Sequence, residues 1–103
     1  MFDWLRRHLP FRLGIVDGDS MLPTLRRGDW LLFLRRPFVV GDIVLADFGI
    51  DGYLVKRVAK ITDVYCERTA VKLVGDNVDV SGTYLVFAED ILGVMLYRLW
   101  RYK

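Results

Sequence analysis

The sequence predicts an all-β protein, a small coiled or barrel-like sheet preceded by a short N-terminal segment. Three observations support this prediction. Short apolar runs recur from residue 13 onward, and turn-forming residues, mostly Gly and Asp, separate them at regular intervals. A third observation is the stretch Gly49-Ile50-Asp51-Gly52, which reads as a hairpin loop between two antiparallel strands. Together they favour a barrel or coiled sheet over a fold with helical crossovers.

The N-terminal segment, residues 1–12, comes first. Its apolar residues stand at positions 2, 5 and 9 with Trp4 alongside, which indicates a short amphipathic helix ended by Pro10. Trp and Phe next to an Arg pair are typical of a membrane interface, although such a segment more often packs on its own domain. Residues 13–103 then form the single main domain, as a chain of 103 residues suggests.

Seven strands are expected within that domain. The apolar runs that define them cover residues 13–16, 30–34, 43–48, 53–65, 71–74, 84–87 and 91–100. No repeat, linker or low-complexity stretch interrupts them.

Charge and cysteine content exclude several classes of site. The net charge of +2 is too small to indicate nucleic-acid binding by itself, and Arg pairs at 6–7, 26–27 and 35–36 are usually solvated surface. With a single Cys66 and a single His8, the chain forms no internal disulfide, and neither a metal site nor a cofactor is expected. No apolar run approaches the roughly 18–20 residues that span a bilayer.

Ser20 lies on a turn between residues that break regular structure. Gly18 permits backbone angles closed to other residues, and Pro23 fixes its own φ. A serine held on such a turn is a candidate nucleophile. A Gly-Asp-Ser turn whose side chains only bond the local backbone is the plainer interpretation of this stretch alone.

Lys56 favours the interpretation of Ser20 as a nucleophile over that of a plain turn. In the strand around it, side chains alternate between faces, so Lys56 shares a face with Leu54 and Val58 while Arg57 lies on the other. If the Lys56 face is inward, burial lowers the pKa of the ammonium group, and a neutral amine is a competent general base near neutral pH. The alternative is a lysine that reaches from a half-buried strand to solvent.

Four motifs in order resemble those of type I signal peptidases and of the SOS-response repressor proteases, which share a Ser/Lys dyad on a coiled β fold. Ser20-Met21-Leu22-Pro23-Thr24-Leu25 with Gly28-Asp29 is similar to their serine motif, and Val55-Lys56-Arg57-Val58 to their lysine motif. The other two are Gly41-Asp42-Ile43-Val44 and Leu73-Val74-Gly75-Asp76-Asn77. The resemblance covers about residues 15 to 94.

The resemblance implies a role for each of five residues. Ser20 would be the acylated nucleophile, and Lys56 would take its proton. The Ser20 backbone N–H would donate to the oxyanion, with Gly18 and Asp19 beside it; Gly18 stands where some signal peptidases carry a serine hydroxyl. Ser81 falls where many signal peptidases place a hydroxyl that orients the lysine.

It also implies a function. We expect a serine endopeptidase that removes a leader or signal peptide from a precursor protein, in the cytoplasm or against a membrane surface. The chain lacks the family's membrane anchor and any cleavage pair ahead of Ser20, and looks most like nickel-type superoxide dismutase maturation proteases. An Asp-Ser-Arg triplet common in the family is replaced by Gly82-Thr83-Tyr84.

Two other functions stay open. One is a signal peptidase domain acting at the membrane, with Trp4, Phe11, Trp30 and Phe33 forming an apolar rim. The other is a basic β-barrel that binds single-stranded nucleic acid through Arg pairs and aromatic residues. Because most of the aromatic residues lie inside apolar runs, as core residues do, nucleic acid is not an expected partner.

Overall fold

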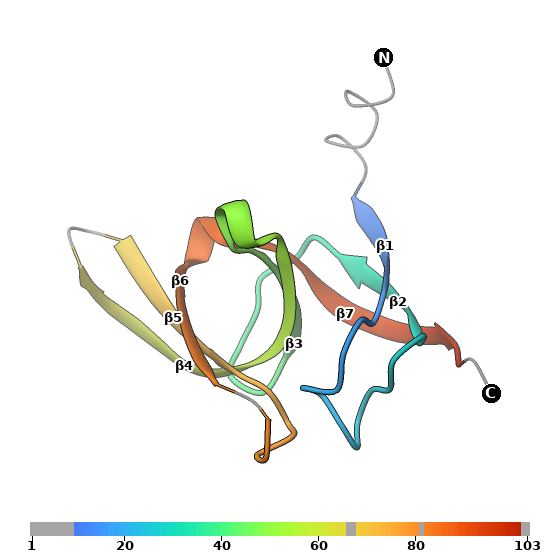
Figure 1. Ribbon diagram of the computed structural model, residues 1–103. Coiled ribbons are helices and arrows are strands. Elements are labelled where there is room, and N and C mark those ends of the chain that lie inside the picture. Colours follow the sequence, from blue (N-terminus) through green and yellow to red (C-terminus); the bar gives the residue numbers. More distant parts are fainter. Residues whose placement is uncertain (1–9, 66–67, 81, 102–103) are drawn as a thin grey trace.

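A computed structural model describes residues 10–65, 68–80 and 82–101. Its strands form one antiparallel sheet in the order β1-β2-β7-β3-β4-β5-β6. The sheet curls so that β3 to β6 make a half-barrel, with β1 and β2 on the other side of β7 (Figure 1). The strands are β1 (Phe11–Ile15), β2 (Trp30–Leu34), β3 (Ile43–Asp47), β4 (Tyr53–Tyr65), β5 (Arg68–Val74), β6 (Thr83–Phe87) and β7 (Ile91–Trp100).

The all-β prediction is confirmed, and each of the seven expected runs is a strand. Three strands begin earlier than their apolar runs, and β6 does so by one residue, at Thr83. β5 starts at Arg68, which pairs with Tyr65 across the hairpin, and β1 starts at Phe11, which pairs with Leu34. Backbone pairing continues through polar residues such as Arg68, so counting apolar residues shortens the strand.

The expected hairpin loop between β3 and β4 is also present. It forms a 3₁₀ turn, η1 (Gly49–Asp51), and the N–H of Gly52 closes it by donating to the Gly49 carbonyl at 3.0 Å. Gly52 has a φ of +87°, a conformation that glycine adopts at little cost. Within the described ranges, no helix is long and apolar enough to cross a membrane.

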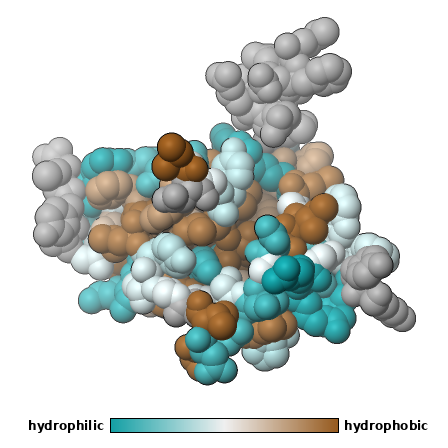
Figure 2. All heavy atoms as spheres, in the orientation of Figure 1, coloured by the Kyte–Doolittle hydropathy of each residue, from teal (hydrophilic) through white to brown (hydrophobic). Residues whose placement is uncertain are grey.

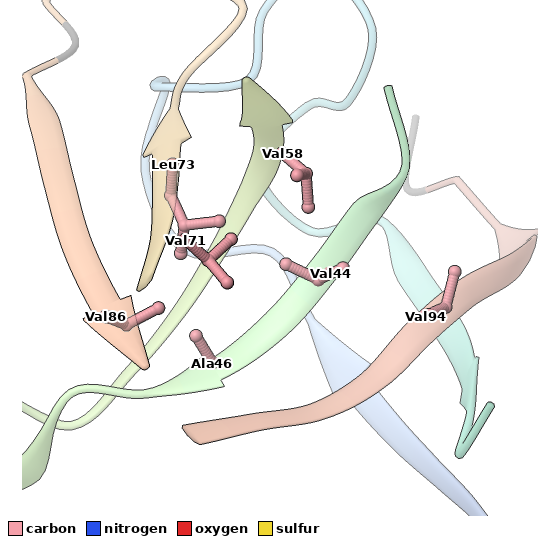
Figure 3. Close-up of a cluster of buried hydrophobic side chains, with 7 residues drawn as sticks. All are labelled: Val44, Ala46, Val58, Val71, Leu73, Val86 and Val94. Atoms are coloured by element: carbon pink, nitrogen blue, oxygen red, sulfur yellow. The ribbon is translucent and has the colours of Figure 1, made fainter. Parts of the chain in front are cut away.

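The larger of two cores fills the concave side of the half-barrel. It is made of small, mostly β-branched side chains that point toward one another from five strands (Figure 3). Their alternation along β3 and β5 is what places them all on one face. The members are Val44, Ala46, Val58, Val71, Leu73, Val86 and Val94.

The second core lies on the opposite face of β3, against β2 and the loop that carries Ser20. Leu31 and Phe33 of β2 are fully buried in it. The predicted apolar rim is therefore wrong for Phe33. Trp30 and Phe33 are three residues apart on one strand, so they point to opposite faces, and Trp30 remains 38% exposed. Trp4 lies outside the described residues.

Candidate functional site

A cavity of about 500 Å³ opens between β1, the loop after it and the start of β4. Ser20 and Lys56, 36 positions apart in the sequence, both line it. The space-filling view shows hydrophobic residues gathered across the middle of the face that it displays (Figure 2). The other lining residues are Phe11, Arg12, Leu13, Gly14, Ile15, Val16, Asp17, Met21, Leu45, Tyr53, Leu54 and Val55.

Two open strand edges border this cavity. β1 is the terminal strand of the described sheet, so only one of its edges is paired, with β2. Residues 53–56 of β4 pair with β3, but pairing between β4 and β5 begins only at Arg57. Both β1 and residues 53–56 therefore have unpaired backbone N–H and C=O groups in the described sheet, and both line the cavity.

The loop that carries Ser20 is closed at its base by backbone hydrogen bonds. The Val16 N–H donates to the Asp29 carbonyl, and the Gly28 N–H donates to the Val16 carbonyl, both at 2.9 Å. Gly18 turns the chain into the loop with a φ of +106°, which confirms the need for a residue without a side chain there. Ser20 itself is half-buried at the mouth of the cavity.

Two apolar side chains fix the underside of the loop. Met21 and Leu25 are each only 2% exposed and pack in the second core. Burial of each side chain stabilises the folded loop by about 1.5–3 kcal/mol. Because Met21 follows Ser20 directly, anchoring Met21 also limits where the serine can lie.

A second loop, after β5, holds the serine loop from outside. The backbone N–H of Asn77 donates to the Ser20 carbonyl at 2.9 Å, and Asn77 Nδ2 donates to the Asp19 carbonyl at 3.0 Å. Next to it, Asp76 Oδ2 accepts a hydrogen bond from Thr24 Oγ1 at 2.5 Å. Both sides of the serine are thus tied to residues 76–77.

Arg57 fixes that second loop in turn. Its Nε and Nη2 each donate to a different oxygen of Asp76 at 2.7 Å, while Nη1 donates to the Gly41 carbonyl at 2.7 Å. The side-chain hydrogen bonds from Arg57 lower the pKa of Asp76 below its usual range, against the opposing effect of burial. The strand residue next to Lys56 therefore fixes Asp76, which bonds Thr24 of the serine loop and precedes Asn77, which bonds the loop backbone.

A fully buried carboxylate, Asp29, closes the far end of the loop. It accepts hydrogen bonds from the Arg26 N–H at 2.9 Å and from Arg101 Nε and Nη2 at 3.0 Å each. Arg101 Nη2 also donates to the Thr24 carbonyl at 3.2 Å. Burial alone would raise the pKa of Asp29, but the bonds from Arg101 and Arg26 outweigh it, and the pKa is lowered.

Lys56 is buried, with 6% of its surface exposed. The expected pairing of faces is confirmed, since Val58 on the same face is also buried while Arg57 on the other is half-buried. Burial lowers the pKa of the Lys56 ammonium group. Its Nζ lies 5.1 Å from the centre of the Tyr84 ring, so the amine has an aromatic face beside it.

The structure brings only some of the predicted site residues together. Ser20 and Lys56 both line the cavity, whereas Gly18 and Asp19 do not. The Asp19 carboxylate points to Arg27 at 3.6 Å instead, with both side chains largely exposed. Ser81 lies outside the described residues.

Asp76, Asn77, Arg57 and Arg101 received no role from the sequence. The first three stand inside the motifs that resemble the peptidases, and that was the available signal. Nothing in the sequence pairs Arg101 with Asp29, 72 positions away.

Comparison with known proteins gives one match. A family model described as Peptidase S24-like matches residues 3–95. No curated protein and no solved structure is significantly similar to the chain.

Proposed function

This chain belongs to the Peptidase S24-like family, a serine peptidase family, and we propose from that premise that it is an endopeptidase in which Ser20 and Lys56 act together. One observation carries the proposal: a buried lysine with a lowered pKa and a serine on an anchored loop line the same cavity. Serine is a weak nucleophile without a base beside it. Arg in place of Lys56 could not serve, because it does not give up its proton.

In the reaction we propose, the neutral Lys56 amine accepts the proton as Ser20 Oγ attacks the substrate carbonyl carbon. The resulting ammonium then protonates the leaving amine as the peptide bond breaks. Water, deprotonated by the same amine, hydrolyses the acyl-enzyme and frees Ser20.

The backbone N–H of Ser20 is the proposed oxyanion donor. No described residue accepts a hydrogen bond from it, while the Ser20 carbonyl is held by the Asn77 N–H at 2.9 Å. The Ser20 N–H itself belongs to the Asp19–Ser20 peptide group, whose carbonyl oxygen accepts a hydrogen bond from Asn77 Nδ2 at 3.0 Å. The peptide groups on both sides of the serine are therefore held in place. Fixed donors stabilise the developing charge without reorganising during the reaction.

The substrate we propose is an extended polypeptide segment. A strand entering the cavity could pair with the open edge of β1 on one side and with residues 53–56 on the other. Backbone pairing of this kind recognises an extended chain largely independently of its sequence. A leader joined to a folded precursor protein by an exposed segment meets this requirement.

For the precursor, we propose a nickel-type superoxide dismutase precursor, processed in the cytoplasm. The proposal rests on the overall resemblance of the chain to the maturation proteases of that enzyme, within the group whose serine and lysine motifs it resembles. In such a reaction, nickel belongs to the product.

The test is cleavage of that precursor by purified protein, followed by mass spectrometry. Ser20→Ala and Lys56→Ala should each reduce the rate by a factor of about 10³ or more. Lys60→Ala is the matched control, because Lys60 lies on the same strand but is exposed. Lys56→Ala with the activity of Lys60→Ala would refute the role of Lys56, and no cleavage by the wild type would refute this substrate.

The surface favours a second candidate, action on precursors at a membrane. Apolar side chains are exposed together on one face of β1, β2 and β7, where Leu13 pairs with Leu32 and Leu32 with Tyr97. The strands carry two charged residues, Arg12 and Arg98, and no acidic one. Flotation with anionic liposomes tests this candidate: co-flotation supports it, and full recovery in the protein fraction contradicts it.

A further inference from the structure

Three of the residues that line the cavity have a basic or a carboxylate side chain. Lys56 is the proposed base, and the other two, Arg12 and Asp17, are opposite in sign. Arg12 lies on β1 and Asp17 just beyond it, on the side of the serine loop. They are five positions apart, or at most about 16 Å along an extended chain. Among the lining residues 11–17, the positive side chain therefore stands near the end away from the serine loop and the negative one at the end next to it.

Arg12 is one of the β1 residues that line the cavity. It is half-buried and pairs across the strands with Phe33, which is fully buried. The next residue on the same face toward the serine is Gly14, which has no side chain to cover it. A Cβ at Gly14 would meet only the Phe33 ring, at 3.4 Å, so packing alone does not require glycine there. The glycine instead leaves space beside Arg12.

No carboxylate of the described residues forms an ion pair with Arg12, in contrast to Arg27, Arg57, Arg68 and Arg101. Much of the cavity wall around it is apolar, including Leu13, Leu45 and Val55. A half-buried guanidinium in such surroundings gains from a carboxylate, which can accept two parallel hydrogen bonds from it.

We propose that Arg12 determines specificity, by binding an acidic side chain of the substrate segment at the end of the cavity far from Ser20. This inference rests on the proposed peptidase function. A strand paired with β1 has the same rise per residue as β1, so the acidic residue should lie about five positions from the substrate residue beside Asp17. Asp17 repels a second acidic residue at the near end, and Arg12 repels a basic one at the far end.

Binding tests the inference without cleavage. The full chain carrying Ser20→Ala is used to select from random displayed peptides, in parallel with the double variant Ser20→Ala/Arg12→Glu. We expect acidic side chains to be enriched at one position by the first protein, about tenfold relative to the second, and basic side chains at that position by the second. Ser20→Ala/Lys72→Glu is the control, since Lys72 is exposed on β5 and makes the same change from a basic to an acidic side chain outside the cavity.

Cleavage of a random peptide mixture by proteins with Ser20 intact gives the second readout. A preference for acidic residues that inverts with Arg12→Glu but not with Lys72→Glu supports the inference. Cleavage with the same preferences in all three proteins overturns it while the proposed peptidase function stands. Inverted binding without cleavage leaves Arg12 as a specificity residue and refutes the peptidase, whereas selection of the same peptides by all proteins refutes the role of Arg12.

Discussion

The backbone N–H of Asn77 donates a hydrogen bond to the carbonyl of Ser20 at 2.9 Å, across 57 positions of sequence. The neighbouring Asp76 is held by Arg57, and Arg57 is the residue after Lys56. One short chain of contacts thus joins the two proposed catalytic residues through the backbone rather than through their own side chains. Because β4 carries Lys56 and Arg57 on opposite faces, the lysine faces the half-barrel interior while the arginine fixes the serine loop.

We predict that Asp76→Asn lowers kcat/KM about 10–100-fold, because the serine loop loses a charged anchor and small displacements of a nucleophile are costly. The inflection of the pH–rate profile should stay where it is, since Lys56 is untouched. Arg57→Lys should reduce kcat/KM less than Arg57→Ala, because an ammonium retains the charge but not the paired hydrogen bonds. Equal activity of Asp76→Asn and wild type would contradict the anchoring role.

Asp29 should make the protein sensitive to acid. Its pKa is lowered in the folded state, so the folded protein binds fewer protons than the unfolded chain near pH 4. The stability contributed by the carboxylate is complete above the unfolded pKa of about 4, and it is lost as the pH falls through the folded pKa. Asp76 contributes in the same direction.

Urea unfolding of Asp29→Asn at two pH values measures this contribution. At pH 7 the variant should be less stable than wild type by about 2–4 kcal/mol, because Arg101 loses a buried charged partner. At pH 3 the difference should shrink, because this pH lies below the unfolded pKa of about 4 and the stabilising contribution of the carboxylate is then declining. Asp79→Asn, at an exposed position, is the control. A difference independent of pH would show that the charge of Asp29 does not stabilise the fold.

The buried Lys56 side chain should destabilise the folded protein. Its lowered pKa means that the unfolded chain binds more protons than the folded protein between the folded pKa and the ordinary value of lysine. Stability therefore rises with pH across that window. Replacing the lysine with a side chain of similar length and no charge removes both the cost and the pH dependence.

Lys56→Met is accordingly predicted to be inactive and yet more stable at pH 7, by about 0.5–2 kcal/mol. Thermal or urea unfolding between pH 7 and 10 measures the effect. The stability of the wild type should approach that of the variant as the pH increases. A variant less stable than wild type at pH 7 would mean that the lysine is held by favourable contacts rather than retained for chemistry.

Gly93 marks a close approach in the sheet. A Cβ added there would lie 2.9 Å from the Cβ of Phe33, which is fully buried. We predict that Gly93→Ala destabilises the protein by about 1–3 kcal/mol, because the Phe33 Cβ is bonded to the β2 backbone and cannot move aside freely. Gly82→Ala is the comparison, since no atom lies within 4 Å of a Cβ at that position. Similar unfolding midpoints for the two variants would contradict the packing argument.

Much of the fold could be predicted from the sequence because strands, turns and the alternation of side chains depend on residues that are close together in the chain. Apolar runs and Gly-Asp turns locate all seven strands, and alternation alone separates the face of Lys56 from that of Arg57. The burial of Phe33 follows from the same rule, applied to its spacing from Trp30.

The support of the site was harder to predict, since it depends on long-range contacts. Asp29 meets Arg101 and Asp76 meets Thr24 only after the sheet has curled, and no periodic pattern encodes either contact. The open edges beside the cavity likewise depend on where pairing between β4 and β5 begins. The resemblance of motifs singles out Asp76 and Asn77, but only the geometry shows that these residues hold the serine loop.

The central claim is that a neutral Lys56 amine activates Ser20, and the pH dependence of kcat/KM tests it most directly. We predict a rate that rises with pH through one inflection, below the ordinary pKa of lysine, because only the unprotonated amine accepts the serine proton. The matched variant Lys60→Ala should keep this profile. A rate that does not change with pH, or an inflection that persists in the residual activity of Lys56→Ala, would contradict the claim.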